Sequence, residues 1–397
     1  MLNMNHIDTI KKLSSDYADD LLFIRRHLHA NPELSMKEEK TAAFIISKLK
    51  EYGIPYQSGI AKTGIVGIIE GKLPGPVIGL RADMDALPIQ EENKLDYASC
   101  NPGVMHACGH DVHITCLLGA ARILNELKDF IKGSIKLIFQ PSEESYPGGA
   151  IQMIQQGALK NPDVSSMFGQ NVFPILPAGK IGIRSGMYMA STDEIYLTVK
   201  GKGGHGAIPD QVIDPILIAS HIIVAIQQIV SRNALPLMPT VISFGKISGA
   251  GRTNIIPDEV KIEGTIRTFN EEWRKTAHEK IRKIAQSLAE GMGGKCEVFI
   301  DKGYPFLVND PTLADFFRKT ASEYVGKENV VELDMAMTSE DFAYYSHTIP
   351  SCFYRLGTRN EEKGIVSNLH TSTFNVDEQS IPLGAGLMAW IAFNQLQ

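Results

Sequence analysis

Hydrophobic and polar residues follow two different periods along the chain, and together these periods predict an α/β architecture. Short runs of branched apolar residues, typical of buried strands, alternate with longer segments in which apolar residues recur every three or four positions. Such alternation is typical of a largely parallel sheet covered by helices. Strands are expected at residues 64–69, 77–80, 135–139, 167–172 and 352–356. Helices are expected at residues 7–29, 38–52, 112–127, 149–157, 311–325, 339–345 and 378–394.

The pattern changes near Gly186. Residues 192–200 alternate polar and apolar side chains, which is typical of a strand with one exposed face. From there the order strand, helix, two strands, helix, strand indicates a ferredoxin-like split βαβ unit. We therefore expect residues 1–188 and 304–397 to form one domain, with an inserted α+β domain at 189–303. Its strands are expected at 192–200, 240–246, 259–268 and 295–301, and its helices at 214–231 and 270–290.

Composition narrows the class of protein. The 397 residues exceed the usual size of a single core, which fits two domains. The net charge of −6 and the lack of a basic run argue against nucleic acid or an anionic membrane as partner. Five scattered cysteines indicate a reducing compartment without a disulfide framework. A polar N-terminal stretch and the lack of an apolar run long enough to span a bilayer predict a cytoplasmic protein.

Candidate chemistry is densest in residues 105–113, which hold three histidines, one cysteine and one aspartate. Cys108 and His110 are two residues apart and can grip one borderline-soft metal ion, with Gly109 allowing the backbone to bend. Alternatively, Cys108 is a nucleophile activated by a histidine, as in cysteine hydrolases. A third interpretation is a loop with a buried thiol and solvated imidazoles. These residues alone leave all three open.

Further metal-compatible side chains follow predicted strands or lie in loops. Asp83 and Asp85 follow one strand, Glu143 and Glu144 follow another, and His370 lies in a late loop. In open α/β sheets, functional side chains collect at the carboxyl ends of strands. Neighbouring side chains on extended backbone point to different sides, so one glutamate can bind a metal while the other faces its water. This division of labour suits hydrolysis of amides or esters.

Several motifs together resemble the metal-dependent M20 peptidase family. The similarity is greatest to the aminoacylase or amidohydrolase branch, which includes hippurate hydrolases, N-acetyldiaminopimelate deacetylases and auxin-conjugate hydrolases. The resemblance covers nearly the whole chain and implies hydrolysis of the amide bond of small N-acyl amino acids. It also implies a mostly parallel-sheet catalytic domain with an inserted α+β, ferredoxin-like lid and dimerisation domain. The motifs are residues 25–34, 81–88, 105–113, 140–144, 203–207, 253–257 and 339–342.

The resemblance also implies roles for several residues of the first domain. Glu143 is the implied general acid and base, acting on a metal-activated water, while Asp83 and Asp85 are implied to orient the ligands. The cofactor is one or two divalent ions per chain, with Mn²⁺ or Zn²⁺ expected and Co²⁺ or Ni²⁺ as further candidates. The implied ligands are Cys108, His110, Glu144 and His370.

In the inserted domain, the resemblance implies contacts with substrate and with a second copy of the chain. His205 is expected to reach across a homodimer and stabilise the oxyanion. Asn254 and Arg267 are expected to bind the substrate's free carboxylate or nearby backbone, and the planar guanidinium suits a carboxylate. Closure of the lid would bring His205 and Arg267 to the metals. Taken without the family, His205 is a loop histidine and Arg267 a strand arginine.

One position departs from the family pattern. The family has Gly-x-His-Val at the end of the fourth strand, and that histidine binds one of two metals, whereas this chain has Asn171 in the same place. An asparagine carbonyl is a harder and weaker ligand than imidazole. We therefore expect one metal position to be weakened. An alternative follows, in which the chain is a metal-poor homologue that binds acyl amino acids or dimerises without turnover.

Overall fold

The computed structural model describes residues 6–397, so residues 1–5 of the predicted first domain lie outside the described part. The chain divides into two compact units, each with a hydrophobic core of its own. Unit 1 holds the residues up to Gly186, Val308–Asp334 and Asp341–Gln397. Unit 2 holds Met187–Leu307 and Met335–Glu340.

Unit 1 is built on an eight-stranded mixed sheet with the order β1-β2-β4-β3-β5-β16-β6-β15. The central neighbours β4, β3, β5 and β16 are parallel, and antiparallel pairs lie towards both sides, which confirms a largely parallel sheet. The run 77–80 reads as continuously apolar because it lies in a central strand, where Ile78 and Leu80 are fully buried. The strands are β1 (Tyr56–Ile60), β2 (Gly64–Glu70), β3 (Leu73–Asp83), β4 (Lys132–Gln140), β5 (Ser166–Pro177), β6 (Ile181–Ile183), β15 (Val330–Glu332) and β16 (Ser351–Arg359).

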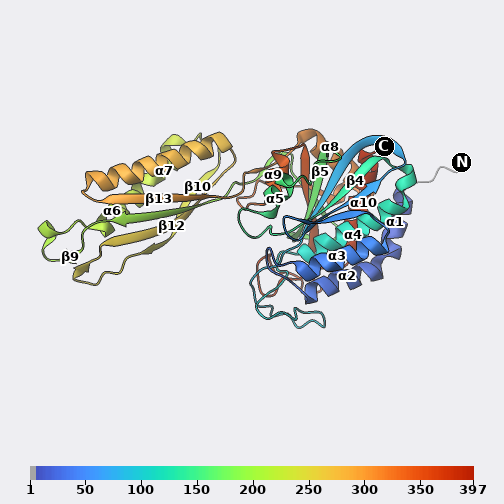
Figure 1. Ribbon diagram of the computed structural model, residues 1–397, viewed down its shortest axis with the longest axis horizontal. Helices are drawn as coiled ribbons and strands as arrows, with labels where there is room; N and C mark the ends of the chain where they lie inside the picture. The colour runs from blue at the N-terminus through green and yellow to red at the C-terminus, as the bar shows by residue number, and fades with distance from the viewer. Residues whose placement is uncertain (1–5) are drawn as a thin grey trace. The chain divides into compact units, whose positions relative to one another are not determined.

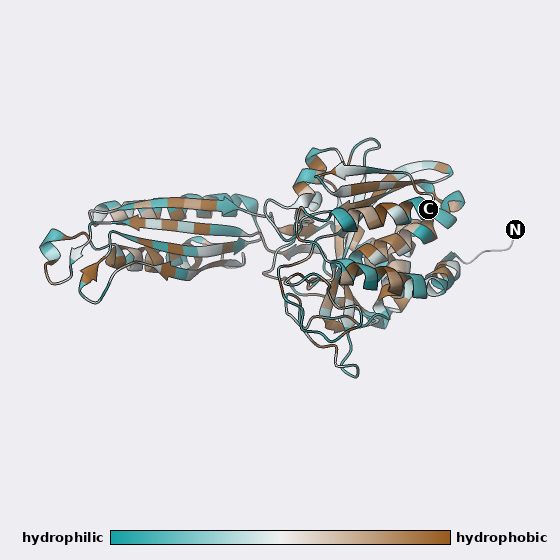
Figure 2. Cartoon of the chain, turned by 60° about the horizontal axis from the view of Figure 1, so that its bottom comes forward, coloured by the Kyte–Doolittle hydropathy of each residue, from teal (hydrophilic) through white to brown (hydrophobic). Residues whose placement is uncertain are grey.

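Helices cover this sheet, as Figure 1 shows. Almost every residue of α4 is buried, because α4 packs against α1, α2 and α10 as well as against the sheet. Figure 2 shows that these helices carry both hydrophobic and hydrophilic residues. The helices of unit 1 are α1 (His6–Asp16), α2 (Ala18–Ala30), α3 (Glu39–Glu51), α4 (His110–Glu126), α5 (Gly149–Gln155), α8 (Pro311–Val325), α9 (Ala343–Ser346) and α10 (Ser380–Gln395).

Three predicted boundaries in unit 1 are wrong. The single helix expected at 7–29 is interrupted at Tyr17, which separates α1 from α2. The strand expected at 77–80 begins already at Leu73 and ends at Asp83, although residues 73–76 contain two prolines and a glycine. The helix expected at 339–345 begins only at Ala343, because the Asp341 side chain instead accepts hydrogen bonds from Gln140 of β4 and from the Ala150 peptide of α5. Strand β1 and the short strands β6 and β15 were missed altogether.

Unit 2 is a four-stranded antiparallel sheet with two helices on one face. The strand order is β10-β12-β8-β13, with α6 after β8 and α7 after β12, which confirms the predicted β-α-β-β-α-β sequence of elements. Both helices begin at good caps, since Asp214 and Asn270 accept hydrogen bonds from the first turns of α6 and α7. The elements are β8 (Asp193–Lys200), α6 (Pro215–Gln228), β10 (Thr240–Ser248), β12 (Glu259–Thr268), α7 (Glu271–Gly291) and β13 (Lys295–Lys302).

Helix α6 and its short π-helical extension form one segment, residues 215–233, that is long and apolar enough to cross a membrane by length and composition. Sequence reading had found no such run. The same property is found in core helices of ordinary globular domains. Here Ile218, Ile222 and Ile226 of this helix are buried in the core of unit 2.

Candidate metal centre

The turn before α4 positions Cys108 and His110. Gly109 adopts a left-handed φ of +78°, and a Cβ atom at this position would come within 2.5 Å of the Val172 side chain. The position therefore needs glycine both for its backbone conformation and for its close approach to β5. Helix α4 starts directly afterwards at His110, so the imidazole projects from the first turn of a buried helix. Cys108 and His110 are both buried.

The strand ends bring carboxylates to the same place. Asp83 ends β3, Asp85 follows two residues later, and Glu143 and Glu144 come shortly after β4. Strands β3 and β4 are parallel neighbours, so their carboxyl ends lie at one edge of the sheet. Asp85 is the hub of this edge. Its two carboxylate oxygens accept hydrogen bonds from the peptide nitrogens of Glu143 and Glu144, each at 3.0 Å.

The four predicted ligands gather in two overlapping groups. Ligating atoms of Cys108, Glu144 and His370 all lie within 4.8 Å of one another, and so do those of His110, Glu143 and Glu144. His370 Nε2 is 3.3 Å from Glu144 Oε1, and His110 Nε2 is 3.9 Å from the same oxygen. Glu144 therefore lies near both imidazoles and would help either histidine to hold a metal ion.

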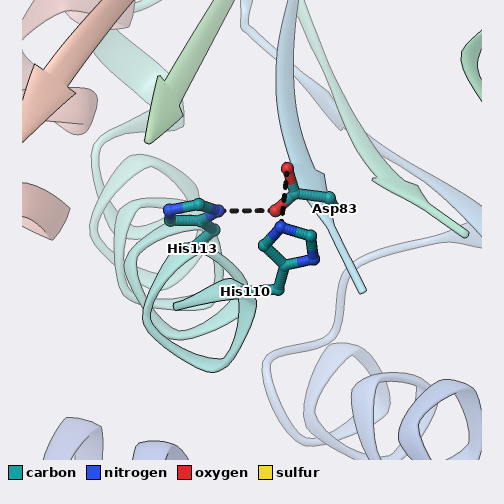
Figure 3. Close-up of side chains that lie close together, drawn as sticks. All are labelled: Asp83, His110 and His113. Carbon is teal, nitrogen blue, oxygen red and sulfur yellow. Dashed lines mark hydrogen bonds and ion pairs between the residues drawn. The ribbon is translucent and has the colours of Figure 1, made fainter. Parts of the chain in front are cut away.

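Asp83 links two histidines of α4, as Figure 3 shows. Its Oδ1 lies 2.5 Å from His113 Nδ1, and its Oδ2 lies 3.7 Å from His110 Nε2. The other ring nitrogen of His113, Nε2, accepts a hydrogen bond from the peptide N–H of Val172 at 2.9 Å. Nδ1 of His113 must then carry the proton that it shares with Asp83. His113 thus ties the end of β3 to the residue that follows Asn171.

Asn171 reaches the site region from β5. Its side chain is 4% exposed, and its Oδ1 accepts no hydrogen bond from any residue in the range 6–397. A buried carbonyl oxygen without a donor costs free energy unless something else binds it. The neighbouring peptide nitrogen, that of Val172, is fixed by His113. The Asn171 Oδ1 atom is therefore available to accept a hydrogen bond or to bind a cation.

The charges of the site favour a cation. Burial alone would lower the pKa of His110, yet the negative charges of Asp83 and Cys108 raise it well above the usual value. Hydrogen bonds to Cys108 and Glu144 raise the pKa of His370 to about 10. Burial and the charge of Glu144 raise the pKa of the Cys108 thiol. A bound divalent cation would reverse these effects, because it stabilises the thiolate and the neutral imidazoles that bind it.

These residues fit a metal by the chemistry of their donors as well. Thiolate, imidazole and carboxylate groups are the ordinary ligands of Zn²⁺ and other first-row divalent ions. Neither ring nitrogen of His110 makes a hydrogen bond of normal geometry within residues 6–397, although Nδ1 approaches Asp85 Oδ1 to 3.4 Å. The same surroundings disfavour the cysteine-hydrolase interpretation, since a nucleophilic cysteine needs a lowered pKa rather than a raised one.

The other predicted site residues lie in unit 2. His205 is in β9 (Gly204–His205) and pairs with Ile255 of β11 (Ile255–Ile256). The peptide N–H of Gly206 donates to the Asn254 carbonyl at 2.9 Å, so His205 and Asn254 share one exposed two-stranded ribbon. Arg267 belongs to β12, and its Nη1 donates to Ser339 Oγ at 3.2 Å. The structure brings the first two together and places Arg267 on a different element.

Sequence reading missed the buried network behind the carboxylates. Arg81 is fully buried and donates to Asp83 at 2.6 Å, Asp341 at 2.8 Å and Gln140 at 3.0 Å. Burial would raise the pKa of Asp83, but the charges of Arg81 and His110 and the hydrogen bond from His113 lower it. The one signal in the sequence was a single arginine directly after the apolar run 77–80, which needs a buried partner.

Comparison with known proteins decides the family. The model for peptidase family M20/M25/M40 matches residues 79–394. The chain belongs to peptidase family M20. This confirms the predicted resemblance, the fold class and the prediction of a hydrolytic enzyme. The chain is 41% identical over 392 residues to thermostable carboxypeptidase 2 of Saccharolobus solfataricus, covering 97% of this chain and 98% of the relative.

Two further relatives add chemical detail about M20 proteins. The chain is 44% identical over 302 residues to an N-acyl-L-amino acid amidohydrolase of Geobacillus stearothermophilus, covering 76% of this chain and 81% of the relative. The solved structure of the Bacillus subtilis YXEP protein, described as a dinuclear metal binding peptidase from the M20 family, superposes with a TM-score of 0.83. That M20 protein is 35% identical to this chain, covering 96% of this chain and 99% of its own.

Proposed function

We propose that this M20 hydrolase cleaves the amide bond of small N-acyl amino acids with the help of one or two divalent metal ions. The observation that carries the proposal is the convergence of Cys108, His110, Glu144 and His370 around buried atoms that lack partners. A carboxypeptidase and an N-acyl amino acid amidohydrolase share a substrate element, namely an amide whose nitrogen belongs to an amino acid with a free carboxylate. The relatives' names therefore support the same substrate class.

The proposed chemistry divides between the metal and the protein. When bound, a divalent ion supplies Lewis acidity and lowers the pKa of a coordinated water to about 7. Glu143 takes the proton of the attacking water and delivers it to the departing amine nitrogen. Its place fits this task, because its ligating atoms lie within 4.8 Å of those of His110 and Glu144 while its peptide N–H is fixed by Asp85.

Three residues of unit 2 complete the proposal. His205 stabilises the negative charge that develops on the carbonyl oxygen. Arg267 binds the substrate's free carboxylate, for which a planar guanidinium supplies two parallel donors. Asn254 binds the carboxylate or the adjoining backbone. The exposure of His205 and Asn254 supports roles in contacts outside their own unit.

The chain is also proposed to act as a homodimer through unit 2, in the cytoplasm. Helix α6 supports the dimer, because its outer face exposes three large apolar residues, among them Val224 at 73% exposure and Leu217 at 51%. Sedimentation velocity should find a dimer for the natural chain and a monomer for Val224→Glu. A dimer that persists in the variant, at the same concentration, would remove α6 from the interface.

Replacement of the proposed base tests the function. Glu143→Ala should reduce kcat on N-acetyl and N-benzoyl amino acids by at least about 10³-fold while the protein keeps its metal. Activity of the natural chain should disappear with a chelator and return with Mn²⁺, Zn²⁺ or Co²⁺. Full activity in Glu143→Ala would refute the assignment. Activity that survives chelation would favour Cys108 as a nucleophile, and metal-loaded protein inactive on the whole substrate panel would favour a non-catalytic homologue.

A further inference from the structure

The segment that carries Glu143 and Glu144 is held by carboxylates rather than by regular secondary structure. Three successive peptide N–H groups, those of residues 142, 143 and 144, all donate to buried carboxylate oxygens. Asp85 accepts two of them, as described above. The third, from Ser142, goes to Glu38 Oε1 at 2.9 Å. The turn at 142–144 is therefore fixed from two sides, by residues far apart in the sequence.

Glu38 lies directly before α3, close to the N-terminal motif at residues 25–34 to which the proposed chemistry gives no task. Its side chain is fully buried. Besides Ser142, its carboxylate accepts hydrogen bonds from the Met36 peptide at 2.9 Å and from Thr63 Oγ1 at 2.8 Å. Three donors around one buried carboxylate hold it in a single orientation. Glu38 thereby joins the start of α3, the turn before β2 and the segment after β4.

The backbone conformation of Ser142 explains why hydrogen bonds from outside the turn are needed. Its φ is +55°, in the left-handed region that residues with a Cβ atom rarely adopt. The hydrogen bond to Glu38 fixes the peptide on one side of this residue. Loss of this bond removes one of the restraints on that conformation and leaves the Gly149 N–H bond to the Ser142 carbonyl, at 2.9 Å, and the two bonds to Asp85. We expect the Ser142 backbone to relax towards a more favourable region and the Glu143 side chain to shift with it.

Ser35 acts on the other side of the same turn. Its hydroxyl donates to Asp85 Oδ2 at 2.6 Å, and that oxygen also accepts the Glu144 peptide N–H. Ser35 and Glu38 are three residues apart. Ser35 supports the Asp85 carboxylate, and Glu38 supplies the other carboxylate that holds the turn. The segment 35–38 is thus shaped to the turn that carries the proposed base.

We propose that Glu38 is a positioning residue, which sets the direction of the Glu143 carboxylate by holding the Ser142 peptide, with Ser35 in a supporting part through Asp85. The proposal rests on the proposed function of Glu143. Glu38 itself touches no proposed metal ligand side chain and no reacting atom. Displacement of a reacting group by about 1 Å costs on the order of 10²-fold in rate, so the loss of this hold should be visible in kcat.

Glu38→Ala is the direct test, and Glu33→Ala is a matched control. Glu33 lies in the N-terminal motif at residues 25–34. Its Oε2 accepts hydrogen bonds from the Thr41 peptide at 2.8 Å and from Thr41 Oγ1 at 3.0 Å, so both bonds go to α3 and neither goes to residues 142–144. Glu38→Ala should lower kcat about 30- to 100-fold, with KM and metal content within twofold of the natural enzyme. Glu33→Ala should leave kcat within threefold. Equal losses in both variants, or a kcat within threefold for Glu38→Ala, would overturn the proposal.

A second substitution asks whether the Ser142 backbone is the route of the effect. Glycine adopts a φ of +55° at little cost, so Ser142→Gly added to Glu38→Ala should recover at least fivefold in kcat. A merely destabilising role for Glu38 predicts no such rescue, and its absence would contradict the proposal. If Glu38→Ala does not fold, Thr63→Val removes only the bond to Oε2. A kcat unchanged within 1.5-fold in that variant would count against Glu38.

Amide hydrogen exchange separates this proposal from the proposed function. In Glu38→Ala, exchange should quicken at least tenfold in a peptide covering residues 141–145, and Glu33→Ala should leave that peptide unchanged. If the natural chain turns over no substrate, the proposed function fails, yet this localised loss of protection would still show that Glu38 holds the turn. Unchanged exchange at 141–145 in Glu38→Ala would overturn the hold itself.

Discussion

Two buried arginines organise the two units in similar ways. In unit 1, Arg81 binds Asp83 and Asp341, and in unit 2, Arg274 binds Asp193 through its Nε at 2.8 Å. Both arginines are almost completely buried. Burial of a charge costs several kcal/mol, so each guanidinium must be matched by carboxylate and carbonyl groups around it. The two networks therefore face a similar cost of burying a guanidinium and offset it in a similar way.

They differ in what lies next to them. The Arg274 network closes on itself, since Asp193 also accepts from His278 Nε2 at 2.6 Å and from the Gly303 peptide at 3.1 Å, and Arg274 donates to the Thr192 carbonyl. The Arg81 network leads through Asp83 to His110, whose ring nitrogens make no hydrogen bond in the described part of the chain. Buried charge therefore does not by itself distinguish the two networks. The unpartnered imidazole beside Asp83, at the carboxyl ends of parallel strands, does.

The largest expected effect comes from removing an orphaned ligand. His110→Ala should lower activity by at least about 10³-fold and reduce bound metal to less than half of that in the natural protein, because the group of His110, Glu143 and Glu144 loses its imidazole. Elemental analysis by mass spectrometry after dialysis measures the second quantity. Unaltered metal content with lost activity would mean that His110 serves the reaction without binding an ion.

Arg274→Met should do the reverse, with a large loss of stability and no loss of metal. The substitution leaves Asp193 buried without its guanidinium, which costs about 3–5 kcal/mol in comparable pairs. The chain has two tryptophans, Trp273 in unit 2 and Trp390 in unit 1, so Trp390→Phe leaves a reporter of unit 2 alone. Urea unfolding followed by Trp273 fluorescence should show the shift. A change of metal content at neutral pH would break the distinction between the two networks.

The candidate ligands could be selected from the sequence, whereas the residues that support them could not. Cys108 and His110 are two residues apart and Glu143 and Glu144 are adjacent, so local spacing and strand ends were enough to select them. The partners of Glu38 and Arg274 could not be found in this way, because Glu38 meets Ser142 across 104 residues and Arg274 meets Asp193 across 81. Only the fold brings such pairs together. The break between α1 and α2 at Tyr17 was not predicted for a related reason, since tertiary packing overrides a continuous apolar pattern.

A smaller effect is expected from restoring an imidazole in β5. Asn171→His should tighten the more weakly held of two ions about 10- to 100-fold, or about 1.4–2.8 kcal/mol, because imidazole is a stronger ligand than an amide oxygen for these metals. Asn171→Ala is the matched control and should weaken the same ion. Competition with a chromogenic chelator, using Mn²⁺ and then Zn²⁺, gives both affinities. If the natural chain already holds two ions equally tightly, Asn171 is a competent ligand and the predicted weakness is wrong.

The smallest expected effect is on the pH dependence of stability, which should differ between the two units. Although burial would raise the pKa of Asp193, hydrogen bonds and charge from Arg274 and His278 lower it. A carboxyl group with a lowered pKa stabilises the fold above its unfolded value of about 3.9 and loses this contribution as the pH falls through the folded value. Unit 2, followed by Trp273 fluorescence in Trp390→Phe, should therefore keep its urea midpoint from pH 7 to 5. Its free energy of unfolding should fall by on the order of 1 kcal/mol below about pH 4.

Metal-loaded unit 1, followed by Trp390 fluorescence in Trp273→Phe, should lose stability at a higher pH, because protons compete with the metal for His110 and His370. Chelation should abolish that earlier loss of stability. If unit 1 resists mild acid equally well with and without metal, these histidines do not hold the ion.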